Sequence, residues 1–260
     1  MKRILLFVLG AVGAQAASAG VYVELVDRDI PSGKVELSQK MYVQNGQGRF
    51  VDSGGRTTLI KDGTMYVIDD ADKSYIAFDK ATMEKLAVKI NAAMAQMKEQ
   101  LAKMPPEQRA QMEAMLPGMA GADKKWVVEA IDTGKSDKVD GRSCRVWDIK
   151  RNGELDDQMC VVPYSSLPGK ENFQAMFEKF AKVFEEMAKS VPMLSGMMAN
   201  EFSAYVKTNG YPVRQRNYEK GKLVDEETVV KVWREETVPA SMFEVPAGYT
   251  RKSMPVGPAQ

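Results

Sequence analysis

Hydrophobic residues recur at three- and four-residue steps between positions 171 and 187, which predicts a helix with one wide apolar face. The opposite side of this helix carries Glu and Lys. Since most other patterned segments predict strands, we expect the apolar face to pack on a sheet. Its residues are Phe173, Met176, Phe177, Phe180, Val183, Phe184 and Met187.

Strand patterns occupy much of the remaining chain. Val21, Val23 and Leu25 occupy alternate positions, and Asn45-Gly46 and Asp62-Gly63 are typical of tight hairpin turns. This spacing predicts an antiparallel meander of about six strands before residue 80. A last hairpin is predicted to turn at Lys220-Gly221.

A helical section follows the meander. Asp79 is suited to cap its N-terminus, and Pro105-Pro106 is expected to end its first helix. We place a helical insert at about 80–118 and further helices at about 169–206. The first helix carries an apolar stripe formed by Met83, Leu86, Ile90, Met94, Met97, Leu101 and Met104.

This order of elements predicts an α+β fold. We expect one large curved antiparallel sheet, an incomplete barrel, with amphipathic helices packed on its concave face. No linker rich in Gly, Ser and Pro divides the chain, so residues 20–250 are expected to form one domain. Residues 251–260 are expected to form a flexible tail.

The first residues have the pattern of a secretory signal peptide. Lys2 and Arg3 precede a short apolar run, and Ala17-Ser18-Ala19 predicts cleavage after Ala19, with Ala16 as the alternative. No Cys follows the cleavage site, so we expect a periplasmic protein of a Gram-negative bacterium without a stable membrane anchor. Without Lys2 and Arg3, 34 of the 36 basic residues remain against 35 acidic ones, a balance that predicts no nucleic-acid partner.

Two cysteines, Cys144 and Cys160, are predicted to form a disulfide. They flank a strand, turn, strand pattern. If they lie opposite each other, residues 151–153 form a three-residue loop with Gly153 at a left-handed position. A redox-active pair is disfavoured by the spacing, so we expect the bond to be structural.

Candidate catalytic chemistry is sparse. The sequence has no histidine, which excludes histidine-based triads and histidine-based zinc sites. Paired carboxylates such as Asp156-Asp157 fall in predicted turns or on polar faces, and Arg214 and Arg216 share a strand face that we expect to be a solvated edge. We therefore predict a protein that is not an enzyme and uses no cofactor or metal.

Methionine is concentrated in the predicted helices. Of 18 Met residues, seven lie between positions 83 and 119 and five between 176 and 198. Flexible thioethers suit surfaces that adapt to apolar partners, so one hypothesis is a hydrophobic cavity over the sheet. Ordinary core packing needs the same periodicity and stays open. The candidate lining residues are Met94, Met97, Leu101, Phe177, Phe180, Phe184 and Met187.

Soft-metal binding is the lesser alternative. Met94-x-x-Met97 and Met112-x-x-Met115 place thioethers one helical turn apart, and Cu(I) accepts such ligands. Met94 and Met97 also belong to the apolar stripe, which favours packing.

Four segments resemble a family of exported bacterial proteins, domain of unknown function 4412, which is similar to the lipoprotein carriers LolA and LolB. They are VYVELV (21–26), TLIKDGTMYVIDDADKSYIAFD (58–79), GYPVRQRNYEKGKL (210–223) and FEVPAGY (243–249). The resemblance implies an incomplete antiparallel barrel with helices as a lid over a hydrophobic cavity. The chain departs from LolB in lacking an anchoring Cys, and neither the Met-rich insert nor the cysteine hairpin is explained by lipoprotein carriage.

These features together predict a periplasmic binding or carrier protein for a lipid or acyl chain. The alternative is an envelope structural or chaperone-like interaction module whose helices form a closed core.

Overall fold

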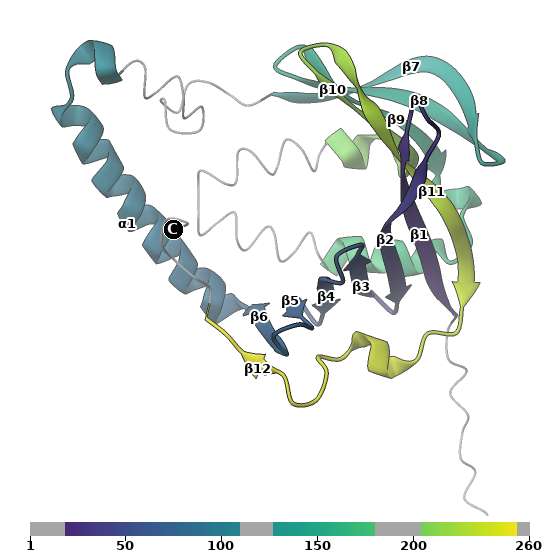
Figure 1. Ribbon diagram of the computed structural model, residues 1–260, viewed down its shortest axis with the longest axis horizontal. Helices are drawn as coiled ribbons and strands as arrows, with labels where there is room; N and C mark the ends of the chain where they lie inside the picture. Colours follow the sequence, from purple (N-terminus) through teal and green to yellow (C-terminus); the bar gives the residue numbers. More distant parts are fainter. Residues whose placement is uncertain (1–18, 110–126, 180–203, 254–260) are drawn as a thin grey trace, which may run out of the picture.

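The computed structural model describes residues 19–109, 127–179 and 204–253 (Figure 1). These residues form an α+β fold built on one large, unclosed sheet, which confirms the predicted class. All neighbouring strands are antiparallel except β12 and β6, which are parallel. The strands are β1 (Gly20–Asp29), β2 (Val35–Gln44), β3 (Gln47–Asp52), β4 (Thr57–Lys61), β5 (Thr64–Asp69), β6 (Ser74–Phe78), β7 (Val128–Val139), β8 (Arg142–Arg151), β9 (Glu154–Pro163), β10 (Gly210–Glu219), β11 (Lys222–Glu236) and β12 (Thr250–Arg251).

Two meanders form this sheet. Strands β1 to β6 follow each other as predicted, and β7 to β11 form a second series of hairpins. The long-range pairing of β1 with β11 joins the two, so the order across the sheet is β12-β6-β5-β4-β3-β2-β1-β11-β10-β9-β8-β7. Strands β12 and β7 are therefore the edges of the sheet.

Helical segments lie between and after these strands. Helix α1 (Lys80–Lys103) begins at the predicted cap, where the Asp79 carboxylate accepts a hydrogen bond from the Thr82 backbone N–H. The other helical segments are 106–109, η1 (Tyr164–Ser166), 170–179, 204–207 and η2 (Ala240–Phe243). None of the helices in the described ranges is both long enough and apolar enough to span a membrane.

The disulfide prediction is confirmed, but the predicted register is wrong. Cys144 and Cys160 are bonded across β8 and β9, with their Cα atoms 5.3 Å apart. The hairpin turn has two residues, Asn152 and Gly153, both with positive φ, which shifts the pairing by one residue from the predicted register, and a bulge after Ile149 shifts it by one more. Val146 therefore lies opposite Cys160, and the disulfide joins diagonal neighbours.

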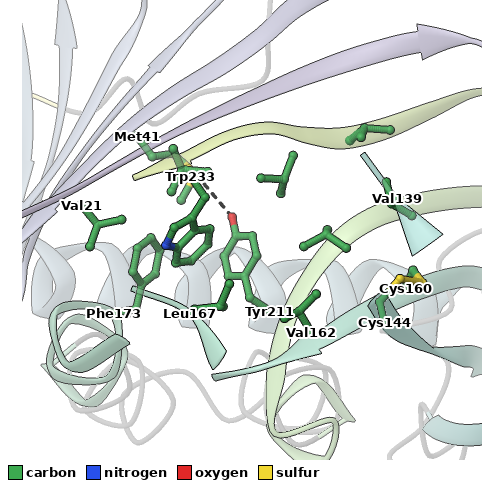
Figure 2. Close-up of a cluster of buried hydrophobic side chains, with 14 of the residues drawn as sticks. Val21, Met41, Val139, Cys144, Cys160, Val162, Leu167, Phe173, Tyr211 and Trp233 are labelled. Atoms are coloured by element: carbon green, nitrogen blue, oxygen red, sulfur yellow. Dashed lines mark hydrogen bonds between the residues drawn. A yellow bond between two sulfur atoms is a disulfide. The ribbon is translucent and has the colours of Figure 1, made fainter. Parts of the chain in front are cut away.

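The main core lies on one face of the sheet, which we call the core face. It is formed by β2, β1, β11, β10, β9, β8 and the end of β7, and the helix at 170–179 packs against it through Phe173 and Met176. Figure 2 shows Phe173 and Val139 in this core. Phe173 stacks on Trp233, while the disulfide closes the far end of the same cluster. The strand residues in this core include Val21, Val23, Met41, Val43, Val146, Cys160, Val162, Tyr211, Val213, Val229, Val230 and Trp233.

The C-terminal segment forms a separate cluster with β2, β4, β5 and β6. Val238 and Phe243 are buried there against Leu59 and Ile68. Segment 250–252 is then paired with β6 through β12, although we expected a loose tail from residue 251. Arg251 also donates hydrogen bonds to Asp79 and Thr82, which ties the C-terminal segment to the start of α1. Residues 254–260 of the expected tail lie outside the described residues.

Candidate functional site

The helical segment 170–179 is held on the sheet by hydrogen bonds from its first turn and from Lys179. The Asn172 side-chain amide donates to the Ala19 carbonyl at 3.0 Å, and its oxygen accepts from the Asn45 backbone N–H at 2.9 Å. The Lys179 ammonium donates to the Asn45 carbonyl at 3.0 Å. The helix is thereby tied to the start of β1 and to the β2–β3 turn.

Two glycines permit the close contact between this helix and the sheet. A Cβ on Gly48 would lie 2.5 Å from the Met176 sulfur, and a Cβ on Gly169 would lie 2.3 Å from Val21 Cγ2. Gly169 also has a φ of +62°, which disfavours other residues. The Gly-Gln-Gly segment at 46–48 thus allows the helix to sit directly on β3.

The helix presents two different faces. Phe173 and Met176 are buried in the main core. Gln174, Phe177 and Glu178, spaced three and four residues apart, line a pocket, and Phe177 also packs against the margin of the core. This pocket has a volume of about 730 Å³ and lies between the helix, η1, the segment 205–209 and the start of β10. Its lining residues are Tyr164, Gln174, Phe177, Glu178, Tyr205, Val206, Asn209, Gly210, Tyr211 and Pro212.

Aromatic rings form much of the pocket wall. The rings of Tyr164 and Phe177 meet edge to face at 6.5 Å, and Tyr211 packs edge to face on Trp233 at 4.8 Å. Tyr211 is buried and its hydroxyl contacts the Met41 sulfur (Figure 2). Burial raises the pKa of Tyr211 and also that of Tyr164 above the ordinary value for tyrosine.

Exposed apolar side chains complete the mouth of the pocket. Tyr205 is 37% exposed and Val206 is 59% exposed. At the base, a Cβ on Gly210 would lie 2.4 Å from the Val162 carbonyl oxygen, so β10 approaches β9 here as only glycine allows. The pocket is thus a preformed concavity with apolar walls and a few polar groups, which is typical of small-molecule binding sites.

Comparison with known proteins identifies the family. The profile described as "Domain of unknown function (DUF4412)" matches residues 92–249. The chain belongs to the DUF4412 family. The matched range contains the described pocket residues, both cysteines and strands β7 to β11.

The solved structures that are similar to this DUF4412 protein include the following two. One is an uncharacterized conserved protein from Thermus thermophilus, with 9% identity, 90% of each chain covered and a TM-score of 0.44. The other is from the MucA/MucB complex of Pseudomonas aeruginosa, with 11% identity, 89% of this chain and 56% of that chain covered, and a TM-score of 0.35. At these TM-scores neither structure assigns a ligand or a partner to the chain. A comparison with curated proteins finds no match.

The DUF4412 chain places only part of the predicted lining set at this pocket. Phe177 lines it, whereas Met94, Met97 and Leu101 lie on α1, outside the set of lining residues. Leu101 is buried, and the two methionines are half-buried. Phe180, Phe184 and Met187 lie outside the described residues, so their role in a cavity stays a prediction. The copper hypothesis for Met94 and Met97 also stays untested.

Most of the pocket was missed by sequence reasoning. Tyr164, Tyr205 and Tyr211 come from three separate segments, and no periodic pattern links them. The available signal was local: Asn209-Gly210 followed by Tyr211 and Pro212 marks a turn into a strand with an apolar start.

A second polar feature lies on the core face beyond the apolar cluster. Glu227 is 5% exposed and accepts hydrogen bonds from Arg216 at 2.7 Å and from Arg28 at 3.2 Å. Arg214 is 8% exposed and donates to Asp137 at 2.9 Å. The expectation that Arg214 lies on a solvated edge is therefore wrong, because β10 is an interior strand between β9 and β11.

Charged side chains also connect the β7–β8 hairpin to β1 and β11 at one end of the curved sheet. Asp140, in the β7–β8 turn, pairs with Arg28 of β1 at 3.4 Å. Arg142 donates to the Val230 carbonyl of β11 at 3.0 Å. The tip of the β7–β8 hairpin thus contacts strands that lie several positions away in the sheet order. Because the carboxylates and guanidinium groups neutralise each other, we assign this cluster a structural role.

Proposed function

We propose that this protein is a periplasmic, non-catalytic binding or carrier protein for a hydrophobic ligand, and that an acyl chain occupies the pocket beside Phe177. The observation that carries the proposal is the pocket of about 730 Å³, walled by Tyr164, Phe177, Val206 and Tyr211. Its volume falls in the range of roughly 300–1,000 Å³ that is usual for small-molecule sites.

The energetics favour an acyl chain. Each buried methylene contributes about 0.8 kcal/mol, so a chain of about eight buried carbons would supply several kcal/mol of affinity before the costs of association. Side chains that are already held in place before binding lower those costs, because less ordering is needed when the ligand binds. Tyr211 is fixed by Trp233 and Met41, and Phe177 is carried by a helix tied to the start of β1 and to the β2–β3 turn.

We place the ligand on the concave face of the curved sheet, beneath helices packed over that face. The resemblance to the lipoprotein-carrier fold implies this arrangement. A disulfide between Cys144 and Cys160 agrees with a location in an oxidising compartment such as the periplasm.

Isothermal titration of the protein with monolauroylglycerol, a neutral twelve-carbon probe, tests the proposal. We expect saturable binding with a stoichiometry near one. Val206→Glu places a carboxylate at the pocket mouth and should weaken binding about tenfold or more, because the apolar chain would have to desolvate it. Val88→Glu is the matched control, since Val88 is 70% exposed on α1 and lies outside this pocket.

Two results would contradict the proposal. One is the absence of binding to the wild-type protein, which would favour an interaction module with a closed core. The other is equal weakening by Val206→Glu and Val88→Glu, which would place the ligand elsewhere or make its binding nonspecific. Thermal unfolding of both variants checks that each is folded.

A further inference from the structure

We infer that the pocket beside Phe177 selects amphiphiles with a cationic head group and discriminates against those with a carboxylate. This inference rests on the proposed function and concerns the charge of the ligand. Among the described residues that line the pocket, Glu178 is the one charged side chain, and it is exposed at the mouth. A ligand carboxylate at this mouth would meet a like charge, whereas an ammonium would meet an opposite one.

The lysines next to the lining residues face other partners. Lys179 follows Glu178 in the chain, but its ammonium donates to the Asn45 carbonyl in the β2–β3 turn at 3.0 Å. Lys207 follows Val206, and its ammonium donates to the Ala130 carbonyl of β7 at 2.8 Å. Both cations are therefore committed to backbone oxygens rather than to the pocket.

The walls themselves favour a cation. Tyr164, Phe177 and Tyr205 supply aromatic rings to the lining, and the faces of such rings attract ammonium groups. Tyr164 and Phe177 stand against each other, and Phe177 is adjacent to Glu178 on the helix. An ammonium at the mouth can thus approach a carboxylate and an aromatic wall together, while its chain enters the apolar interior.

Paired titrations with dodecyltrimethylammonium and dodecanoate, both below their micellar concentrations at pH 7, test the inference. The two probes share chain length and differ in charge. We expect the cation to bind about tenfold more tightly than the carboxylate, as one close charge contact plus aromatic contacts would give. Raising the salt concentration should reduce this ratio, since the Glu178 carboxylate is exposed.

Glu178→Gln should bring the two affinities to within about threefold of each other, because it removes the charge and keeps the shape. Glu171→Gln is the matched control: Glu171 is exposed on the same helix, two turns away and outside the pocket lining. It should leave the ratio unchanged.

Equal or tighter binding of dodecanoate would overturn the inference, as would a ratio that Glu178→Gln does not change. In either case, binding of monolauroylglycerol would still support an apolar-ligand pocket. If none of the three probes binds, the proposed function fails and the inference fails with it.

Discussion

Asp137 and Arg214 form a 2.9 Å salt bridge that runs beside the disulfide. Asp137 lies opposite Cys144 in the pairing of β7 with β8, and Arg214 lies opposite Cys160 in the pairing of β10 with β9. The disulfide therefore joins β8 to β9, and the ion pair beside it joins the flanking strands β7 and β10. The disulfide lies at the end of the core that is remote from the helix at 170–179 (Figure 2).

Acid should weaken this salt bridge in a defined direction. The Lys138 backbone N–H and the Arg214 guanidinium lower the pKa of Asp137 in the folded protein. Its contribution to stability is therefore present above the unfolded-state pKa of about 3.9 and is lost as the pH falls below that value through the folded-state pKa. We expect the melting temperature of Asp137→Asn to fall less than that of the wild type between pH 5 and pH 2. Circular dichroism melts across this range measure the difference, and parallel curves for the two proteins would contradict it.

The buried carboxylate of Glu227 should be important for stability. Glu227→Gln removes the charge that Arg28 and Arg216 contact, and loss of one partner in a buried ion pair typically costs about 3 kcal/mol of unfolding free energy. Glu226→Gln is the neighbouring control, because Glu226 is exposed and its substitution should cost less than about 0.5 kcal/mol. Urea titrations measure both values. Equal, small losses would show that the cluster does not support the fold.

The close packing of the helix at 170–179 on the sheet depends on Gly169. Gly169→Ala would force a left-handed conformation on alanine and would place its Cβ against Val21, so we expect a loss of about 2–4 kcal/mol of unfolding free energy. Gly33→Ala separates the two causes, since Gly33 has a φ of +71° and no atom within 4 Å of the added Cβ. That variant should lose about 1 kcal/mol, the conformational part alone. Urea titrations compare the two variants, and similar losses would rule out tight packing at Gly169.

Local chemistry made much of the fold predictable. Asn45-Gly46 and Asp62-Gly63 adopt the positive φ values that tight hairpin turns require, and Asp79 caps α1 as its sequence position suggests. Each of these signals is contained in a few adjacent residues. The cysteine pairing was also predicted, although the register and loop length used to argue for it were wrong.

Features that depend on bulges and long-range pairing were not predictable from the same patterns. The two-residue turn and the bulge after Ile149 each shift the pairing by one residue, so Val146 lies opposite Cys160 and the disulfide to Cys144 runs diagonally. A second bulge near Val213, beside Pro212, changes the alternation along β10 and brings Arg214 to the core face. The pairing of β1 with β11 joins segments about 200 residues apart. The sequence of neither strand indicates which strand it pairs with.

The pocket was hidden for a related reason. Phe177 was found because it lies on a periodic helix face, but Tyr164, Tyr205 and Tyr211 reach the same place from a single 3₁₀ turn, a short helical segment and a strand start. Such convergence depends on tertiary packing, and a single sequence carries no periodic signal for it.

Photo-cross-linking tests the central claim most directly. The protein is incubated with a monoacylglycerol that carries a diazirine in its chain, irradiated, digested and mapped by mass spectrometry. We predict labelling of the peptides that contain Tyr164, Phe177 and residues 205–212, and loss of that labelling when unmodified monolauroylglycerol is added in excess. Labelling confined to α1, around Met94 and Met97, or labelling that excess probe does not displace, would contradict the assignment of the ligand to this pocket.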